Sequence, residues 1–195
     1  MAEEKNKEKA DSKEKVEEKI EKENKMRKIF IEKVVLSVGA TGDELEKGMK
    51  LLKLISEKKP IKTRTRKRIP NFAVRPGLEI GCKVTLRGKE VEELLKKLLA
   101  TIDNQLKEKQ VVDENFSFGI KEYIEIPGME YQRDIGIIGF GVTVVFRRKG
   151  KRTEIKKIKR GKNPKKQKVT KKEIIDFMKE NYNVEFLTKF NREIR

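Results

Sequence analysis

The residues of this sequence that are best suited to chemistry form a dense basic run, and the chemistry is the neutralisation of phosphates. Residues 58–77, "KKPIKTRTRKRIPNFAVRPG", carry eight basic side chains, three prolines and no acidic side chain. Guanidinium groups bind phosphate oxygens through paired hydrogen bonds, and ammonium groups act as compact point charges. Like charges this close repel one another. The run therefore either meets a polyanion that neutralises it or is simply solvated.

A second basic run spans residues 147–172 and holds fifteen basic side chains against one acid, Glu154. Together the two runs carry +22, more than the +18 of the whole chain, so the remaining residues are mildly acidic. Charge confined to two patches is typical of a nucleic-acid-binding protein. The contacts that we predict for the second basic patch are Arg147, Arg148, Lys151, Arg152, Lys156, Lys157, Lys159 and Arg160.

Catalytic chemistry has little support in the sequence. There is no histidine, and the one cysteine, Cys82, lies on the apolar face of a predicted strand, where a core position is expected. The glycines of "GIIGFG", residues 136–141, do not follow the order of a phosphate-binding loop. We therefore predict no enzyme, no metal and no cofactor, although a carboxylate pair holding Mg²⁺ stays open at this point.

A membrane-surface role is the rival explanation for the basic patches. It would require apolar anchors beside the charges, but the sequence has no tryptophan and the basic runs contain few apolar residues. No apolar run approaches the ~18 residues of a membrane span, and the N-terminus has no apolar signal-peptide core. A single cysteine favours an intracellular protein. These features predict a cytoplasmic protein without a membrane partner.

Two segments differ in their capacity to fold. Residues 1–25 contain eight basic and nine acidic side chains and few apolar ones, which predicts a flexible charged extension that could also fold on RNA. Residues 26–195 contain the clustered apolar positions, so we expect one α+β RNA-binding domain with basic loops at 58–77 and 147–172.

The elements that must position the basic runs follow from hydrophobic periodicity. Strands are expected at 29–38, 80–87 and 137–147, with short strand or loop pieces at 116–120 and 123–126. A helix should begin at Asp43 as N-cap, with Glu46 completing a capping box, and end near Glu57. A second apolar stripe runs from Val91 to Leu106. Thr170 and Glu173 predict a capping box for the last helix.

This order of elements indicates an α+β fold, with helices on one face of a mostly antiparallel sheet. Strand 80–87 then has a second face, which presents Lys83, Thr85 and Arg87. That face is either an ordinary solvated surface or a platform for phosphates and riboses, flanked by the basic loops.

Three segments of the sequence resemble the L-five family of large-subunit ribosomal proteins, called L-eleven in eukaryotic naming, over residues 26–187. They are "IEKVVLSVGATGD", "KKPIKTRTRKRIPNFAVRPGLEIGCKVTLRG" and "FSFGIKEYIEIPGMEYQRDIGIIGFGVTVVF". The wording "IPGMEY" and the insertion at 147–172 are similar to archaeal or eukaryotic members. The resemblance implies binding to 5S rRNA and large-subunit rRNA in the central protuberance, a loop that contacts P-site tRNA, and neighbouring ribosomal proteins as partners.

The resemblance also implies where RNA contacts lie. Ser37, Lys58 and Thr85 occupy family positions that touch 5S rRNA, although the first is commonly Asn and the second commonly Gln. Gly141 stands where the family commonly has an acid. With the basic run, the expected rRNA-binding residues are Ser37, Lys58, Lys62, Thr63, Arg64, Arg66, Lys67, Lys83, Thr85 and Arg87. The expected tRNA-contacting loop consists of Pro70, Asn71, Phe72, Arg75, Pro76 and Gly77.

Alternatives remain open at this point. Phe72 could stack on a base or ribose, or it could pack against the domain's own sheet. A Mg²⁺-dependent RNA-processing enzyme and a free-standing RNA-binding protein are the two rival functions. The second of these would need several exposed aromatic side chains on the sheet, and only Phe72 and Tyr123 or Tyr131 are candidates.

Overall fold

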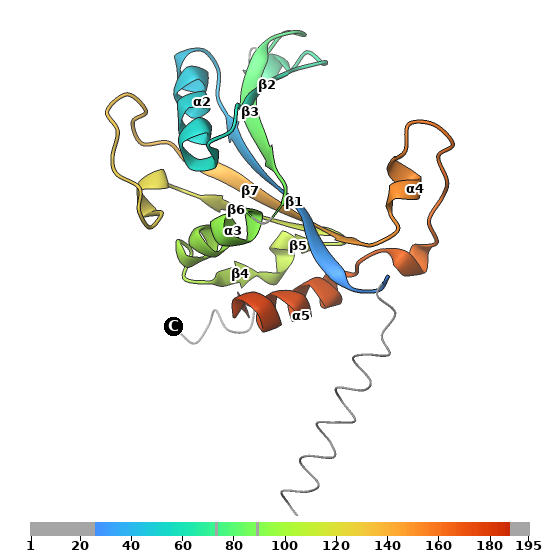
Figure 1. Cartoon of the computed structure of the whole chain (residues 1–195). Coiled ribbons are helices and arrows are strands. Elements are labelled where there is room, and N and C mark those ends of the chain that lie inside the picture. Colours follow the sequence, from blue (N-terminus) through green and yellow to red (C-terminus); the bar gives the residue numbers. More distant parts are fainter. Residues whose placement is uncertain (1–25, 73, 89, 188–195) are drawn as a thin grey trace, which may run out of the picture. The chain divides into compact units, whose positions relative to one another are not determined.

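The computed structural model describes residues 26–72, 74–88 and 90–187 (Figure 1). The predicted extension at 1–25 lies outside the described residues. The described chain forms two compact units. The sheet unit comprises residues 31–147 and 168–187, and the basic unit comprises residues 26–30 and 148–167.

A six-stranded sheet with the order β2-β3-β1-β7-β6-β5 organises the sheet unit. Its strands are β1 (Ile29–Gly39), β2 (Ile61–Arg64), β3 (Glu79–Leu86), β5 (Val111–Val112), β6 (Asn115–Ile120) and β7 (Phe140–Arg148). β3 runs antiparallel to both β1 and β2, and β6 runs antiparallel to both β5 and β7. The short strands β4 (Gln105–Lys107) and β8 (Glu185–Leu187) form a separate parallel pair.

The helices are α2 (Asp43–Ser56), α3 (Glu90–Ala100) and α5 (Lys171–Tyr182) in the sheet unit, and the short α4 (Arg152–Ile155) in the basic unit. Single 3₁₀ turns are η1 (Pro70–Phe72), η2 (Glu108–Gln110), η3 (Tyr123–Glu125) and η4 (Lys165–Gln167). The mostly antiparallel sheet with its helices confirms the predicted α+β class.

Strict alternation of side chains gives the sheet one buried face. The buried positions are Val34, Leu36, Val38, Cys82, Val84, Leu86, Phe116, Phe118, Ile120, Phe140, Val142, Val144 and Phe146. α2 packs closely here, since a Cβ on Gly48 would lie 3.0 Å from Cγ1 of Val38. The ring of Phe177 in α5 meets that of Phe146 at 5.7 Å. The alternate residues of the same strands therefore lie on the other face.

The start of α2 corrects one prediction. Asp43 is the first helical residue and not the N-cap, which is Gly42 with a φ of 62° and no capping side-chain hydrogen bond. The positive φ at this turn suits glycine, and it shifts Asp43 into the first turn beside Glu44 and Glu46. These acids face the positive end of the helix dipole instead of closing a capping box.

The second apolar stripe is also shorter than predicted, because α3 ends at Ala100. Asp103 and Asn104 both adopt positive φ, and Leu106 lies buried in β4. Short polar side chains tolerate the left-handed region, so the pair ends the helix although the apolar spacing continues. β7 likewise begins at Phe140, later than the predicted residue 137.

The last helix begins as predicted. Thr170 and Glu173 form a capping box at the start of α5, and the backbone N–H of Thr170 donates to the Glu173 carboxylate at 2.9 Å. This reciprocal pairing satisfies donors that the first turn of a helix leaves without partners.

Candidate nucleic-acid interface

The uncovered face of the sheet brings together residues that are far apart in the sequence. The register places Ser37 of β1 directly opposite Lys83 of β3, and Lys83 in turn opposite Ile61 of β2. Val35 lies opposite Thr85 two pairs further along. Ser37, Lys83 and Thr85 are all exposed, so three of the predicted rRNA-binding side chains form one surface. We call this surface the polar face.

Small residues make the polar face low. Gly39 pairs with Gly81, and Gly119 of β6 pairs with Gly141 of β7. Ser117 pairs with Thr143 on the same face of the sheet. At these pairs, where the strands carry only small side chains, a bulky backbone can approach the sheet closely. Sequence reasoning missed Ser117 and Thr143, although their alternation with buried neighbours was a usable signal.

Gly141 lies against Ser37 across the sheet. The hydroxyl of Ser37 donates a long hydrogen bond of 3.5 Å to the carbonyl oxygen of Gly141. A Cβ built on Gly141 would lie 3.3 Å from Oγ of Ser37, which is a tight contact. Ser37 and Gly141, the two positions at which the resemblance implies a larger side chain in the family, are therefore neighbours in space.

The described residues of the first basic run after Pro60 form a hairpin that continues β2 and β3, seen at the top of Figure 1. The backbone N–H of Thr65 donates to the Leu78 carbonyl at 3.0 Å. Ile69 and Val74 exchange two hydrogen bonds, of 3.0 and 3.1 Å, near the tip. The sequence had predicted a basic loop here, and the strand pairing of β2 was not predicted.

Acidic residues just outside the first run neutralise part of its charge. Glu79 accepts hydrogen bonds from Nζ of Lys62 at 2.8 Å and from Nη2 of Arg64 at 3.1 Å. Both donors hold the pKa of the Glu79 carboxyl below its ordinary value. The charge of the run is thus partly neutralised within the protein. This is a third possibility beside neutralisation by a polyanion and simple solvation, the two considered from the sequence. Sequence reasoning missed Glu79 because it lies two residues beyond the run.

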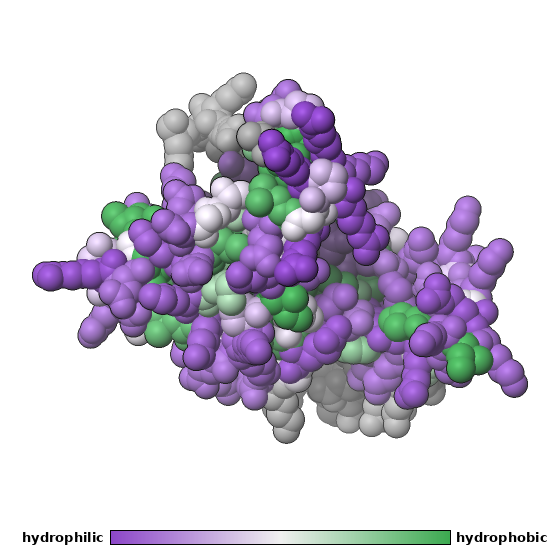
Figure 2. All heavy atoms as spheres, turned by 90° about the horizontal axis from the view of Figure 1, so that it is seen from above, coloured by the Kyte–Doolittle hydropathy of each residue, from purple (hydrophilic) through white to green (hydrophobic). Residues whose placement is uncertain are grey.

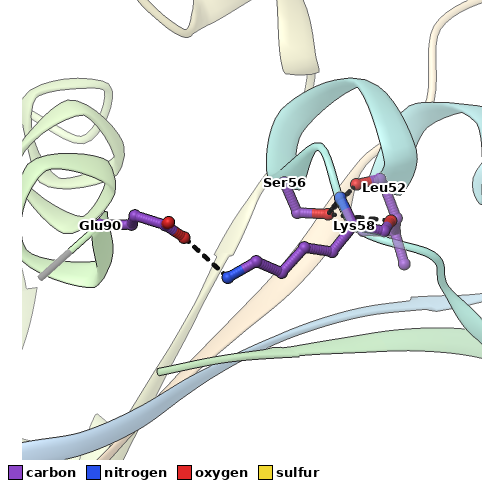
Figure 3. A network of polar contacts seen from close by, with 4 residues as sticks. All are labelled: Leu52, Ser56, Lys58 and Glu90. Atoms are coloured by element: carbon purple, nitrogen blue, oxygen red, sulfur yellow. Dashed lines mark hydrogen bonds and ion pairs between the residues drawn. The ribbon is translucent and has the colours of Figure 1, made fainter. Parts of the chain in front are cut away.

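Lys58 takes part in another such contact, with Glu90 (Figure 3). Its ammonium group lies 2.7 Å from a carboxylate oxygen of Glu90 at the start of α3. Its backbone N–H donates to Oγ of Ser56 at 3.3 Å, and that hydroxyl donates to the Leu52 carbonyl in the last turns of α2. The structure therefore directs Lys58 toward the helices, while Ser37 and Thr85 lie together on the sheet.

The hairpin tip is exposed and basic. Phe72 is 78% exposed, so it does not pack against the sheet. Val74 is buried, whereas the other described residues of the predicted tRNA-contacting loop are exposed: Pro70, Asn71, Phe72, Arg75, Pro76 and Gly77. Arg66, Lys67 and Arg68 are exposed beside them, as is Arg87 at the end of β3, while Thr63 is half-buried.

The second basic patch divides by exposure. Arg147 is mostly buried, with 17% of its side chain exposed, and Nη1 lies 3.5 Å from a Glu32 oxygen. Arg148 and Lys151 are half-buried. In the basic unit the exposed members are Arg152, Lys156, Lys157, Lys159 and Arg160. Ile155 and Ile158 are exposed among them, the latter at 76%, which charge counting alone overlooked.

Other kinds of site find no support in the part of the chain that is described. No three or more His, Cys, Asp or Glu side chains in it gather to hold a metal ion. Cys82 is buried as predicted, and burial raises the pKa of its thiol, which disfavours the reactive thiolate. No described helix is long and apolar enough to cross a membrane. The surface seen in Figure 2 is largely hydrophilic, with separate hydrophobic spots.

Comparison with known proteins accounts for most of the chain. Residues 24–75 match the model of the family described as ribosomal protein L5, and residues 79–177 match the model described as the C-terminus of that ribosomal protein family. A large ribosomal subunit protein uL5 from Nanoarchaeum equitans is 43% identical over 168 residues, which cover 85% of this chain and 99% of the relative.

Two further archaeal relatives have the same name. The protein from Sulfolobus acidocaldarius is 41% identical over 169 residues, covering 85% of this chain and 95% of the relative. The protein from Methanoculleus marisnigri is 43% identical over 163 residues, covering 82% and 98%. On these matches, the chain belongs to the ribosomal protein L5 family, whose members are named as proteins of the large ribosomal subunit.

Proposed function

We propose that this protein binds 5S rRNA through the polar face and the basic hairpin, and so helps to attach 5S rRNA to large-subunit rRNA in the central protuberance. As a member of the ribosomal L5 family, the chain has a structural and not an enzymatic role. The proposal places it on cytoplasmic ribosomes beside neighbouring ribosomal proteins. The remaining rival, a free-standing RNA-binding protein, has no specific observation in its favour.

The observation that carries the proposal is the continuity between two kinds of surface. Lys83 of β3 lies on the polar face between Ser37 of β1 and Ile61 of β2, and the hairpin that β2 and β3 form has a tip that presents exposed cations. Cations placed beside a low surface of hydroxyls and glycines can neutralise phosphates while the strands contact riboses and base edges. The predicted rRNA-binding residues other than Lys58 lie on this face or on the hairpin.

The hairpin tip is proposed to contact P-site tRNA. Phe72 presents an exposed ring that can stack on a base, and Arg75 is exposed close by in the sequence. The second basic patch is proposed to neutralise phosphates of large-subunit rRNA through its exposed members in the basic unit.

Two lysine-to-alanine substitutions, one on the polar face and one as a control, test the proposal. Lys83→Ala should weaken the binding of 5S rRNA by the full chain, and it should flatten the plot of log binding constant against log salt by about 0.7–0.9, the value for one lost phosphate contact. Lys96→Ala removes the same charge from an exposed position in α3 and serves as the control. Equal effects of the two substitutions would place the RNA surface elsewhere.

A further inference from the structure

The base of the β2–β3 hairpin contains one carboxylate that two cations share. One carboxylate oxygen of Glu79 accepts a hydrogen bond of 2.8 Å from Nζ of Lys62. The other oxygen accepts hydrogen bonds from Nη2 of Arg64 at 3.1 Å and from Nε of Arg64 at 3.4 Å. Arg64 remains 71% exposed and Lys62 39% exposed, so an incoming anion can reach both. This arrangement lies on the β2–β3 hairpin, to which the proposed function assigns RNA contacts. Lys62 is opposite Cys82 in the register, so its side chain lies on the other side of the strands from Lys83.

A register shift in the hairpin builds the contact. Thr63 pairs with Gly81, so regular pairing would place Arg64 opposite Ile80, but a β-bulge places it opposite Glu79 instead. Bulges re-aim side chains and are specific features of a strand pair. The bulge therefore brings the Glu79 carboxylate next to Arg64. Lys62, two residues earlier on β2, also reaches this carboxylate.

Glu79 divides the hairpin into two electrostatic regions. At the base it leaves Lys62 and Arg64 with a combined charge of +1, and hydrogen bonds from both keep its pKa low, so it stays ionised at neutral pH. Toward the tip, Arg66, Lys67 and Arg68 are exposed, and the run from 58 to 77 contains no acid. The tip can attract any polyanion, whereas the base attracts one only weakly while Glu79 holds both cations.

We propose that Glu79 is a specificity-determining residue of the RNA surface, because it admits only an RNA whose phosphates reach both Lys62 and Arg64. Exposed ion pairs are weak enough to be exchanged for contacts to phosphate. An RNA that fits the hairpin base replaces the carboxylate on both cations. An RNA that meets only the tip leaves Glu79 in place and gains no contact with either cation, so non-cognate binding is suppressed more than cognate binding.

Glu79→Gln tests this inference, which rests on the proposed function, in the full chain. The dissociation constants of 5S rRNA and of a structured non-cognate RNA of similar length are measured at several salt concentrations. The ratio of the dissociation constant of the non-cognate RNA to that of 5S rRNA should be at least threefold smaller for Glu79→Gln than for the parent protein. The salt slope of the non-cognate RNA should steepen by roughly 0.7–1.8, since one or two cations become available.

Glu90→Gln is the matched control. It removes one carboxylate from a comparable exposed pair, in which Lys58 lies 2.7 Å from Glu90, and it changes the net charge by the same amount. An unchanged ratio of the two dissociation constants in Glu79→Gln, or an equal change in Glu90→Gln, would overturn the inference. If Lys83→Ala also leaves 5S rRNA binding intact, the proposed function fails as well; if Lys83→Ala weakens it, the role of Glu79 alone is refuted.

Discussion

At the scale of single residues, neighbours in space decide what each predicted contact can do. Lys83 and Lys58 are both exposed lysines, yet Lys83 lies opposite Ser37 on the polar face while Lys58 is directed to Glu90. Thr85 is exposed on the same face as Lys83, one alternate position along β3. A lysine there can neutralise a phosphate, whereas a threonine offers only a hydroxyl donor and acceptor.

Thr85→Val should separate these two kinds of contact. The substitution keeps the β-branched shape and removes the hydroxyl, so binding of 5S rRNA should weaken by about 1 kcal/mol, as expected for one lost hydrogen bond. The salt slope should stay unchanged, because a hydroxyl contact releases no counterion. Filter binding across a salt series measures both quantities. A slope that moves with Thr85→Val would show that the residue acts through the placement of a cation.

At the scale of elements, the β2–β3 hairpin is the feature that organises the charge. Backbone bonds from Thr65 and the Ile69–Val74 bridge extend the ladder beyond the strands, so the cations sit on an ordered scaffold. Glu79 neutralises the base of that scaffold and leaves its tip bare. The contribution of a basic residue to RNA binding should therefore depend on its position along the hairpin.

Alanine substitutions along the hairpin test this dependence. Arg66→Ala combined with Lys67→Ala should flatten the salt slope by about 1.4–1.8, corresponding to two lost phosphate contacts. For a non-cognate RNA that meets only the tip, adding Arg64→Ala should flatten it by less than the further ~0.7–0.9 of a full contact, because Glu79 stays on Arg64 and offsets part of that charge; for 5S rRNA, which replaces Glu79, the third step should be a full one. A full third step with the non-cognate RNA would show that any RNA displaces Glu79 from Arg64.

At the scale of the whole molecule, the chain combines a packed α+β unit with surfaces whose positive charge is far from neutralised within the isolated protein. The net charge is +18, and the sheet unit buries its apolar residues on one face only. Such a surplus of cations favours association with a polyanion over self-association. Membership of the ribosomal L5 family identifies the large ribosomal subunit as the setting.

Sedimentation of cell extract through a density gradient checks this conclusion for the intact protein. The native chain should travel with large ribosomal subunits at low salt and should shift toward the free fraction as salt rises, because counterion release dominates its binding. A Lys83→Ala chain should leave the subunit fraction at a lower salt concentration than a Lys96→Ala chain. A parent protein that sediments freely at low salt would contradict the proposed function.

The sequence by itself determined the features that depend on local spacing. Alternation along residues 80–87 indicated that Cys82 is buried and that Lys83 and Thr85 are exposed, and Thr170 with Glu173 indicated the start of α5. These predictions succeeded because side-chain period and capping involve residues close together in the chain. The capping box expected at Asp43 failed because the positive φ of Gly42 shifted the start of α2 by one residue.

The tertiary structure alone decided which charges are available. The pairing of Ser37 with Lys83 joins strands 46 residues apart, and the contact of Arg64 with Glu79 requires a bulge that no local pattern announces. The engagement of Lys58 by Glu90 likewise depends on how α2 and α3 pack. Electrostatic partners are set by distance in space, so composition could reveal that the hairpin is basic but not which of its cations remain free for RNA.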